Sequence, residues 1–379
     1  MTEFSDFDRT AMRRALELAA RGLTTTQPNP RVGCVIARGS RVVAEGWHVR
    51  AGESHAEVAA LAAAGRQAEG ASVYVTLEPC SHHGRTPPCV DALLAARVAR
   101  VVYAMADPNP EVNGRGAGLL AAAGVVVEAG LLAAEAAALN AGFVKRMQTG
   151  RPWVRVKLAA SLDGHTALAN GASRWISGEA AREDVQHWRA RSSAILTGIG
   201  TVLSDDPRLD VRLPDEAGGV RRQPLRVVLD SSLRTPPQAR LFTVAGEVLI
   251  VTAVSASDPR WEPRCAALAA RGARIETLPA VGARVPLPAV LERLGELEIN
   301  ELQVEAGPTL AGELLRQELA DELLLYVAPK LLGPSARPLF AFPELAELDA
   351  APMFAIAEVT RVGDDLRLLL TPRAARAAQ

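Results

Sequence analysis

The segment Ser54-His55-Ala56-Glu57 and the later segment TLEPCSHHGRTPPC, residues 76–89, decide how this chain is interpreted. Zn²⁺ prefers imidazole nitrogen and thiolate sulfur, and a hydrolytic zinc site keeps three protein ligands and one position for water. His55, Cys80 and Cys89 are three ligands of these types. Glu57 is a carboxylate that the metal does not need. The two segments together therefore predict a metal site with an adjacent carboxylate.

Such a site suits the hydrolytic removal of an amino group. The metal lowers the pKa of bound water toward neutrality, and the water can then attack an amino-bearing ring carbon. A proton must reach the departing ammonia, and we expect Glu57 to carry it. The same spacing, H-x-E followed by P-C and a second cysteine, is the signature of zinc deaminases.

Both ligand segments are expected to open helices. Ser54 is predicted to be an N-cap with His55 as the first helical residue, because the Ala-rich segment 56–65 follows. Pro87 and Pro88 precede an apolar helical pattern that begins at Cys89. Two helix N-termini would then converge on the metal, and their partial positive charge would favour the thiolate form of Cys89. In the alternative interpretation, Ser54-x-x-Glu57 is only a capping box.

The eight residues between the two cysteines depart from the common P-C-x-x-C spacing. They bring His82, His83 and Arg85 next to the predicted metal. A loop with imidazoles and a guanidinium suits a phosphate group, so we expect His82 and Arg85 to bind substrate. A solvated polar loop, or a loop histidine that replaces a ligand, are the alternatives.

The chain resembles the RibD family of bifunctional riboflavin-biosynthesis enzymes. The resemblance rests on HAE, on residues 76–89, on ADPNPEVNGRG (106–116) and on PNPRVG (28–33). It continues in KLAASLDG (157–164), TVLSDDPRL (201–209), VEAGPTLAGELL (304–315) and APKLLG (328–333). It thus covers nearly the whole chain. It implies a zinc-dependent deaminase followed by an NADPH-dependent reductase.

The chain of 379 residues is longer than a chain that usually folds around a single hydrophobic core, so we expect two domains. The pattern restarts at a Gly/Pro turn, which puts a deaminase domain at 1–147 and a reductase domain at 148–379. No apolar run approaches the ~18 residues of a membrane span, and the N-terminus does not resemble a secretory signal. We expect a cytoplasmic protein in which Cys34 and Cys265 are buried, reduced thiols. Cys34 also remains a minor candidate for a fourth metal ligand.

Charge argues against a nucleic-acid substrate. The chain has a net charge of −1, and aromatic residues make up only 4% of it. An enzyme acting on RNA or DNA needs a basic field and usually aromatic faces for stacking. We therefore expect a small phosphorylated substrate, with neither nucleic acid nor membrane as a partner, and the resemblance implies that this substrate is a pyrimidine.

The first half alternates between helical and strand patterns. A helix is expected over 8–21, strands over 32–37 and 41–48, then helices from 55 and 89 with strands over 72–77 and 100–106, and finally a helix over 116–124 and a strand over 125–130. This αββαβαβαβ order predicts a three-layer sandwich, and the resemblance implies that it is of the cytidine-deaminase-like type. Segment 106–116 joins a strand end to a helix start, where open α/β sheets bind ligands. Asn29 precedes the first strand. By resemblance it contacts the base, and otherwise it belongs to a Pro-framed turn.

The second half contains βα units without a G-x-G-x-x-G fingerprint. Strands lead through Gly198 and Gly200, and through Gly307-Pro308-Thr309, toward helices whose first N–H groups suit a phosphate. Asp230-Ser231-Ser232 ends another strand. Together these features resemble the cofactor cleft of dihydrofolate-reductase-like enzymes. The resemblance implies a dihydrofolate-reductase-like α/β domain with NADPH as cofactor, and hydroxyls such as that of Ser231 suit its 2′-phosphate.

The resemblance also implies individual binding residues. NADPH would be lined by Ala159, Trp175, Thr201, Asp205, Ser231 and the stretch Gly307, Pro308, Thr309, Leu310, Ala311, Gly312 and Glu313. The substrate of the reductase would be held by Ser173, Arg189, Leu209, Arg212 and Glu305. The guanidinium groups of Arg189 and Arg212 are suited to bind a 5-phosphate. In the alternative interpretation, both residues are solvent-facing charges. Lys157 and Asp163 carry no firm assignment.

The resemblance therefore implies deamination of a diamino-pyrimidinone ribosylamine phosphate and NADPH-dependent reduction of the ribosyl group of the product to ribityl. By resemblance, we also expect a homodimer formed through the reductase half. Two other classes stay open at this stage. One is a nucleic-acid base deaminase with a C-terminal targeting domain. The other is a non-enzymatic zinc-stabilised binding protein whose site is closed by Cys34 or a loop histidine.

Overall fold

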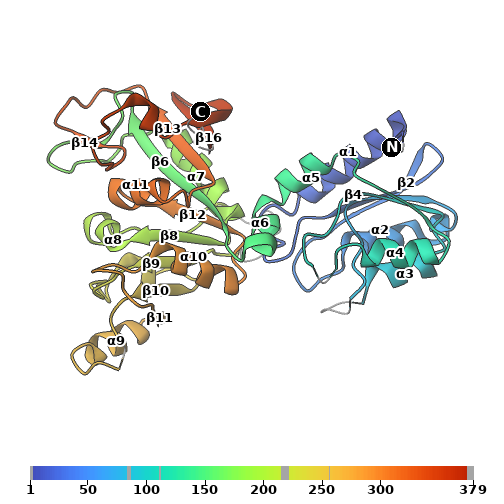
Figure 1. The fold of residues 1–379 in the computed structure, drawn as a ribbon, viewed down its shortest axis with the longest axis horizontal. Helices are drawn as coiled ribbons and strands as arrows, with labels where there is room; N and C mark the ends of the chain where they lie inside the picture. Colours follow the sequence, from blue (N-terminus) through green and yellow to red (C-terminus); the bar gives the residue numbers. More distant parts are fainter. Residues whose placement is uncertain (1–2, 83–86, 111, 215–221, 256, 374–379) are drawn as a thin grey trace. The chain divides into compact units, whose positions relative to one another are not determined.

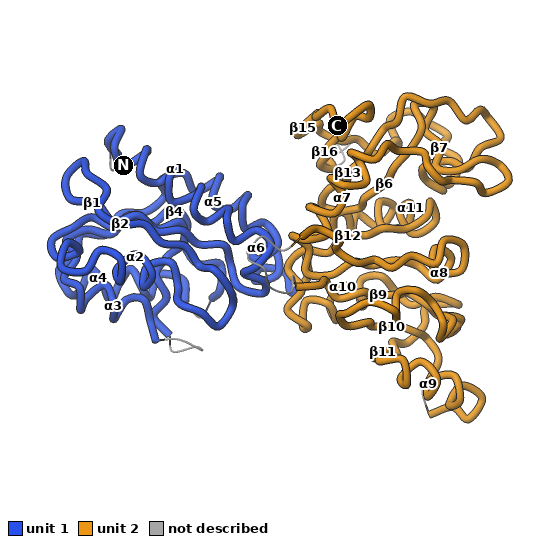
Figure 2. Tube along the Cα trace, turned by 180° about the vertical axis from the view of Figure 1, so that it is seen from behind, with its two compact units in different colours: residues 1–150 blue, residues 151–379 orange. Residues whose placement is uncertain are grey.

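The computed structural model describes residues 3–82, 87–110, 112–214, 222–255 and 257–373. The chain divides into two compact units, residues 1–150 and residues 151–379 (Figure 2). The division expected after residue 147 falls inside α6 (Ala141–Thr149), the last helix of the first unit. Within the described ranges, none of the helices combines the length and the apolar character that crossing a membrane requires.

Unit 1, coloured from blue to green in Figure 1, is built on a five-stranded sheet with the strand order β2-β1-β3-β4-β5. β1 pairs antiparallel with β2 and β3, whereas β3, β4 and β5 run parallel. The remaining elements are α1 (Asp6–Ala20), β1 (Gly33–Arg38), β2 (Arg41–Trp47), α2 (Ala56–Ala64), η1 (Gly65–Ala68), β3 (Ser72–Leu77), α3 (Cys89–Ala95), β4 (Arg100–Met105), α4 (Arg115–Ala122), β5 (Val126–Ala129) and α5 (Ala133–Leu139).

Alternating residues of the strands bury side chains on both faces of this sheet. On β1, Cys34 and Ile36 pack in the core cluster that includes α2, α3 and α4. Their neighbours Val35 and Ala37 pack in the cluster that includes α1 and α5. The predicted three-layer sandwich and the order αββαβαβαβ are therefore confirmed. The sequence analysis did not predict α5 and α6.

Gly46 sets the distance between α2 and β2. A Cβ atom at this position would lie 2.5 Å from the carbonyl oxygen of Ala56 and from the backbone nitrogen of Ala60. Real Cβ atoms do not approach backbone so closely, so only glycine lets the first turn of α2 rest on the strand. This contact positions the start of the helix, where His55 and Glu57 lie.

Unit 2 is built on a nine-stranded sheet with the order β11-β10-β9-β8-β12-β6-β13-β16-β15. The pairs from β11 to β13 are parallel, and β16 and β15 extend the sheet antiparallel. Its elements are β6 (Trp153–Ser161), β7 (His165–Ala167), α7 (Glu179–Arg191), β8 (Ala194–Gly198), α8 (Ile199–Asp205), β9 (Leu225–Leu229), η2 (Arg240–Phe242), β10 (Val248–Thr252), α9 (Glu262–Ala269), β11 (Ala273–Thr277), α10 (Leu287–Glu296), β12 (Glu301–Glu305), α11 (Pro308–Arg316), β13 (Glu322–Ala328), β14 (Arg337–Pro338), η3 (Leu348–Ala350), β15 (Phe354–Val362) and β16 (Asp365–Pro372).

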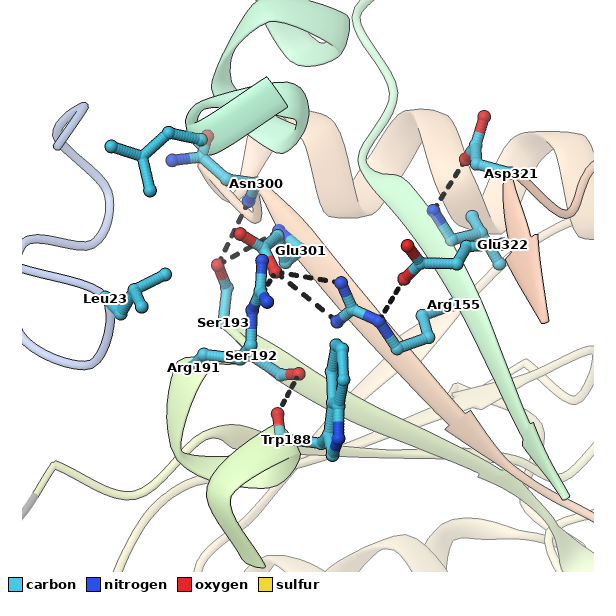
Figure 3. Close-up of polar contacts among 12 residues, drawn as sticks. Leu23, Arg155, Trp188, Arg191, Ser192, Ser193, Asn300, Glu301, Asp321 and Glu322 are labelled. Carbon is cyan, nitrogen blue, oxygen red and sulfur yellow. Dashed lines mark hydrogen bonds and ion pairs between the residues drawn. The ribbon is translucent and has the colours of Figure 1, made fainter. Parts of the chain in front are cut away.

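The two faces of this sheet differ in chemistry. One face is apolar and packs against α10 and α11 through residues such as Val156, Leu302 and Val304. The other face, beneath α7, carries buried charged groups (Figure 3). There, Arg155 on β6 pairs with Glu322 on β13 and with Glu301 on β12.

The Arg155 network continues into α7. The guanidinium of Arg191 donates to Glu301 at 3.1 Å. The ring of Trp188 lies beneath Arg155 at 4.6 Å and beneath Arg191 at 5.0 Å, each measured to the ring centroid. Buried charges destabilise a fold unless they are paired, and here each carboxylate meets an arginine. The network thus ties α7 to the three central strands.

Candidate active sites

His55, Cys80 and Cys89 come together in unit 1 as the sequence predicts. One ligand atom of each lies within 4.8 Å of the others. The His55 Nδ1 atom is 3.2 Å from the Cys89 sulfur and 3.5 Å from the Cys80 sulfur. Tetrahedral Zn²⁺ with bonds of about 2.0 Å to nitrogen and 2.3 Å to sulfur separates such atoms by about 3.5 Å. Both the donor set and the spacing fit zinc.

Helix α2 begins one residue later than predicted. The N-cap is His55, with extended backbone angles of φ −71° and ψ 162°, and Ala56 is the first helical residue. The prediction that Ser54 caps this helix is wrong, and the N-cap makes no side-chain capping hydrogen bond. The physical reason is that extended backbone at His55 turns its imidazole away from the helix toward the two thiols.

Cys89 is the first residue of α3 and Pro88 is its N-cap, so the prediction of a helix beginning at Cys89 is confirmed. The backbone N–H of Cys89 donates to the Cys80 sulfur at 3.3 Å. The Cys89 thiol lowers the pKa of Cys80 to about 4, and hydrogen bonds from His55 and the Cys89 backbone add to this effect against the cost of burial. Cys80 is therefore held as a thiolate, the form that binds metal.

Glu57 lies in the first turn of α2, is buried, and forms a hydrogen bond with the Cys89 thiol. Burial raises the pKa of Glu57 to about 7, and the neighbouring Cys80 thiolate adds to the increase. A bound cation would act in the opposite direction. Glu57 thus stands beside the ligands without being one of the cluster, as the sequence analysis expected. A carboxyl with a pKa near neutrality can both accept and release a proton.

The described part of segment 106–116 packs against the Pro79-Cys80 segment. The Glu78 carboxylate accepts hydrogen bonds from the backbone N–H groups of Gly114 at 3.0 Å and Ala117 at 3.2 Å. Burial raises the pKa of nearby Asp107 to about 6. A Cβ atom on Gly116 would lie 2.0 Å from the Pro79 carbonyl oxygen. Glu78 and Gly116 therefore fix the backbone that carries Cys80, and the sequence analysis missed both.

Asn29 reaches the metal cluster through His48. The Asn29 Nδ2 group is 3.1 Å from His48 Nε2, and His48 Nδ1 is 3.0 Å from the Ser54 carbonyl oxygen. Because the amide donates to Nε2, the other nitrogen of His48 carries the proton and donates to Ser54. The His48 ring meets the His55 ring edge to face at 5.4 Å. Sequence reasoning overlooked His48, although its position at the end of a strand near His55 was a usable signal.

The loop between the cysteines is only partly described. His82 is exposed, whereas Arg85 and His83 lie outside the described residues. Within the part of the chain that the structure describes, neither His82 nor Cys34 belongs to the ligand cluster. Cys34 is a buried free thiol, as expected. Cys265 is free but only half-buried, because helix α9 exposes part of its surface.

In unit 2, the predicted cofactor residues follow the carboxyl ends of neighbouring parallel strands. Asp230 and Ser231 follow β9, and Gly307 follows β12 as the N-cap of α11. Ala159 lies in β6, and Thr201 and Asp205 lie in α8. Gly200 lies inside α8 instead of preceding the helix. Open α/β sheets bind ligands at this edge, so the positions are consistent with a common cleft.

The stretch 307–313 offers only its first turn to a ligand. Ala311 and Gly312 are buried in the packing of α11, and a Cβ atom on Gly312 would lie 2.9 Å from the Ala341 carbonyl oxygen. The Glu313 carboxylate pairs with Arg316. The backbone around Gly307 is open, since no atom of the described residues lies within 4 Å of a Cβ atom built there. The fit to a cofactor phosphate therefore rests on the N-terminus of α11.

Trp175 is 63% exposed, which is unusual for so large an apolar side chain. The Arg182 guanidinium lies 4.4 Å from its ring centroid, and the Lys330 ammonium donates to its carbonyl oxygen at 2.8 Å. Ser173, two residues earlier, is half-buried. An aromatic ring that contacts a guanidinium and stays largely exposed is suited to stack against a planar group.

Arg189 does not face solvent, so the alternative interpretation of this residue as a solvent-facing charge is wrong. It is buried, and its guanidinium forms a fork with the Glu305 carboxylate at 2.7 Å and 2.8 Å. Its remaining nitrogen donates to the Asp210 carbonyl oxygen. Arg212 is exposed, and Leu209 is buried with a positive φ of 53°. Arg189 and Glu305 therefore form one unit, and Arg212 is the more accessible cation.

Comparisons with known proteins agree with both sites. Residues 5–105 match the cytidine and deoxycytidylate deaminase zinc-binding region, and residues 152–368 match the RibD C-terminal domain. The riboflavin biosynthesis protein RibD of Escherichia coli K12 is 50% identical over 367 residues, which cover 95% of this chain and 98% of the relative. The chain belongs to the RibD family. The RibD of Haemophilus influenzae is 44% identical and covers 98% of this chain, with 100% of the relative covered.

Solved structures of the RibD family have the same fold along the whole chain. Acinetobacter baumannii RibD superposes with a TM-score of 0.89 at 44% identity, covering 97% of this chain and 99% of that one. A Thermotoga maritima protein, described as a diaminohydroxyphosphoribosylaminopyrimidine deaminase/5-amino-6-(5-phosphoribosylamino)uracil reductase, gives 0.83 at 32% identity, with the same coverage. The predicted deaminase and reductase folds are therefore confirmed.

Membership of the RibD family settles the class of protein. The chain is a bifunctional deaminase and reductase of riboflavin biosynthesis that acts on a small molecule, with Zn²⁺ and NADPH as cofactors. The C-terminal half is a RibD reductase domain and not a targeting module. The two alternative classes, a nucleic-acid base deaminase and a non-enzymatic zinc protein, are therefore not favoured.

Proposed function

We propose that unit 1 hydrolytically deaminates 2,5-diamino-6-ribosylamino-4(3H)-pyrimidinone 5′-phosphate. We further propose that unit 2 reduces the ribosyl group of 5-amino-6-(5-phosphoribosylamino)uracil to ribityl with NADPH. The observation that carries the proposal is the cluster of His55, Cys80 and Cys89 with the Glu57 carboxyl beside it. The name of the Thermotoga maritima relative supports the choice of substrates.

In the deaminase, His55 Nδ1 and the two sulfurs are the proposed zinc ligands. When bound there, Zn²⁺ acidifies water so that a nucleophile is available near neutral pH. Glu57 takes the proton from the water on a carboxylate oxygen and delivers it to the departing amino group. The buried position of Glu57 directly beside the ligand cluster supports this role, because a proton carrier must lie next to the reacting groups. Asn29, His82 and Arg85 are the proposed substrate contacts.

In the reductase, the proposed NADPH contacts are Ala159, Trp175, Thr201, Asp205, Ser231 and residues 307–313. The cofactor supplies a hydride, so these residues mainly bind and orient it. Ser173, Arg189, Leu209, Arg212 and Glu305 are the proposed substrate contacts. The exposed guanidinium of Arg212 supports phosphate binding, whereas the Arg189 fork supports a role in holding Glu305.

The deaminase domain is assigned to the first unit and the reductase domain to the second. The compact division after Gly150 and the family matches support a boundary a few residues beyond the expected position of 147. A cytoplasmic location is part of the proposal, because the free buried thiol of Cys34 suits a reducing compartment.

We also propose a homodimer formed through unit 2. Exposed apolar side chains on the β15–β16 hairpin support it: Ile356, Val359 and Leu366. Such a patch at a sheet edge commonly marks an interface. Sedimentation should give twice the chain mass, and replacing Ile356 and Val359 by Glu should give the single-chain mass. A wild-type monomer would contradict this part.

Nucleic acid is not a proposed partner. The net charge of −1 supports this, because phosphate binding needs a basic field. A gel shift with tRNA and single-stranded DNA at low salt should show no retardation. Retardation at micromolar protein would contradict it.

The direct test of the two activities uses the pyrimidine substrate with and without NADPH. Ammonia should appear in both reactions, and the nicotinamide absorbance should fall only when both compounds are present. Ammonia that appears only with NADPH, or NADPH oxidation without ammonia, would contradict the assignment of deamination to unit 1 and its place as the first step.

A further inference from the structure

Gln303 is a fully buried amide next to the Glu305 carboxylate. It lies in the central strand β12, and its side chain is 0% exposed. Its Nε2 group donates to Glu305 Oε1 at 2.8 Å. Side chains two apart in a strand share one face of the sheet, so Gln303 lies between the Arg155–Glu301 network and Glu305, beneath α7.

The Glu305 carboxylate is held asymmetrically. Its Oε1 atom accepts from Arg189 Nε at 2.7 Å and from Gln303 Nε2 at 2.8 Å. Its Oε2 atom accepts from Arg189 Nη2 at 2.8 Å. A carboxylate offers about four lone-pair sites, two on each oxygen. Among the described residues, the donors therefore fill Oε1 and leave one lone pair on Oε2.

The orientation of the Gln303 amide follows from this contact. If the amide were flipped, its oxygen would face the carboxylate oxygen, which repels it. Gln303 Oε1 has no hydrogen-bond partner among the described residues. A buried acceptor without a partner destabilises a fold, so stability alone would favour an apolar side chain at this position. The benefit of a glutamine here must therefore lie in its donor.

We propose that Gln303 is a positioning residue of the reductase, which holds Glu305 so that the free lone pair of Oε2 is the one that meets substrate. This inference rests on the proposed function, in which Glu305 contacts the substrate. Without the Gln303 donor, only the Arg189 fork remains, and the carboxylate can tilt about that fork.

The test compares Gln303→Met with wild type in the full chain. Methionine has a similar volume but no donor, and it also removes the unpartnered acceptor. We expect the reductase kcat/KM for the aminouracil substrate to fall about tenfold, the loss expected for one hydrogen bond to a charged group. The KM for NADPH should stay within about twofold, because Gln303 is buried. Ammonia release by unit 1 of the same chains should be unchanged and controls for the amount of active chain, while the unchanged KM for NADPH shows that unit 2 is folded.

Gln303→Glu adds a pH readout that a packing role would not change. The charged or titratable groups facing Glu305 are Lys157 on β6, Arg189 on α7, Tyr326 on β13 and, beyond Arg189, Asp210. Two adjacent carboxyls share a proton at low pH, and the shared proton restores a donor toward Glu305. Reductase activity of this variant should therefore approach wild type at the acid end of the profile and be lost as pH rises. The Gln303→Met profile should be lower than wild type at all pH values.

Glu305→Gln separates failure of this inference from failure of the proposed function. If Glu305→Gln lowers reductase activity but Gln303→Met matches wild type, the positioning role is overturned and the proposed function stands. If Glu305→Gln itself matches wild type, the proposed contact between Glu305 and substrate is wrong. A Gln303→Glu profile parallel to that of wild type would also overturn the positioning role.

Discussion

Glu57 is the residue on which deamination depends most strongly. Glu57→Gln keeps the size and the buried position but cannot take a proton from water. We expect ammonia release to fall by at least a hundredfold, because general acid–base catalysis typically contributes that much. NADPH oxidation on the deaminated substrate should be unchanged. Glu53→Gln, an exposed change in the preceding loop, is the matched control. Wild-type ammonia release by Glu57→Gln would show that Glu57 is not the proton carrier.

His48 links the predicted base contact Asn29 to the metal cluster. His48→Ala removes the acceptor for the Asn29 amide and the donor to the Ser54 carbonyl. The deaminase kcat/KM should fall about tenfold, the cost of losing hydrogen bonds that orient a binding group. His187→Ala, an exposed imidazole on α7, should leave it unchanged. Steady-state ammonia assays on both variants test this expectation. Equal deaminase kcat/KM in the two variants would show that His48 does not connect Asn29 to the metal cluster.

At the scale of residues, the sequence predicted those groups that chemistry demands. His55, Cys80 and Cys89 were predictable because few side chains can bind zinc and their order along the chain is diagnostic. The N-cap of α2 was not predicted correctly, because the composition of the helix is almost the same whether it begins at His55 or one residue later. His48 and Glu78 were missed because their partners, Asn29 and Gly114, lie 19 and 36 residues away in the chain.

At the scale of elements, the start of α4 must approach the Pro79-Cys80 segment closely. Gly116→Ala would put a Cβ atom 2.0 Å from the Pro79 carbonyl oxygen, so either α4 or the Pro79-Cys80 segment must move. We expect lower zinc affinity and a deaminase activity at least tenfold below wild type. The Cβ atom of Gly118→Ala, two residues later in the same helix, would have no neighbour within 4 Å in the part of the chain that the structure describes. This variant should keep full activity and gain up to about 1 kcal/mol in the free energy of unfolding from helix propensity.

Zinc content, ammonia assays and urea unfolding of the two variants decide the matter. Equal zinc content and activity in Gly116→Ala and Gly118→Ala would contradict the role of this contact.

The elements themselves were largely predictable in unit 1, because the apolar periodicity of each strand and helix is strong. Helices α5 and α6 were not predicted, because the Ala- and Leu-rich segment after Gly130 has no Ser, Thr, Asp or Asn to mark the start of α5, whose N-cap is Leu132. The strand order of unit 2 depends on contacts between distant segments, which local pattern does not reveal.

At the scale of the whole molecule, each unit carries a separate site. A mixture of Glu57→Gln and Glu305→Gln chains contains one intact site of each kind. We expect the mixture to convert the pyrimidine substrate to the ribityl product with release of ammonia and oxidation of NADPH, because the intermediate can pass through solution. Each variant alone should not complete the conversion. Failure of the mixture, with each remaining activity intact, would mean that both sites must act on the same chain.

The most direct test of the account is the zinc dependence of ammonia release. Zinc bound per chain is measured together with ammonia release after removal of metal by a chelator and after stepwise return of Zn²⁺. We predict that both are lost together and return together, reaching full activity at one zinc per chain, and that Cys80→Ala recovers neither. Full ammonia release from protein free of zinc and other divalent metals would contradict the assignment of His55, Cys80 and Cys89 as the centre of the deaminase.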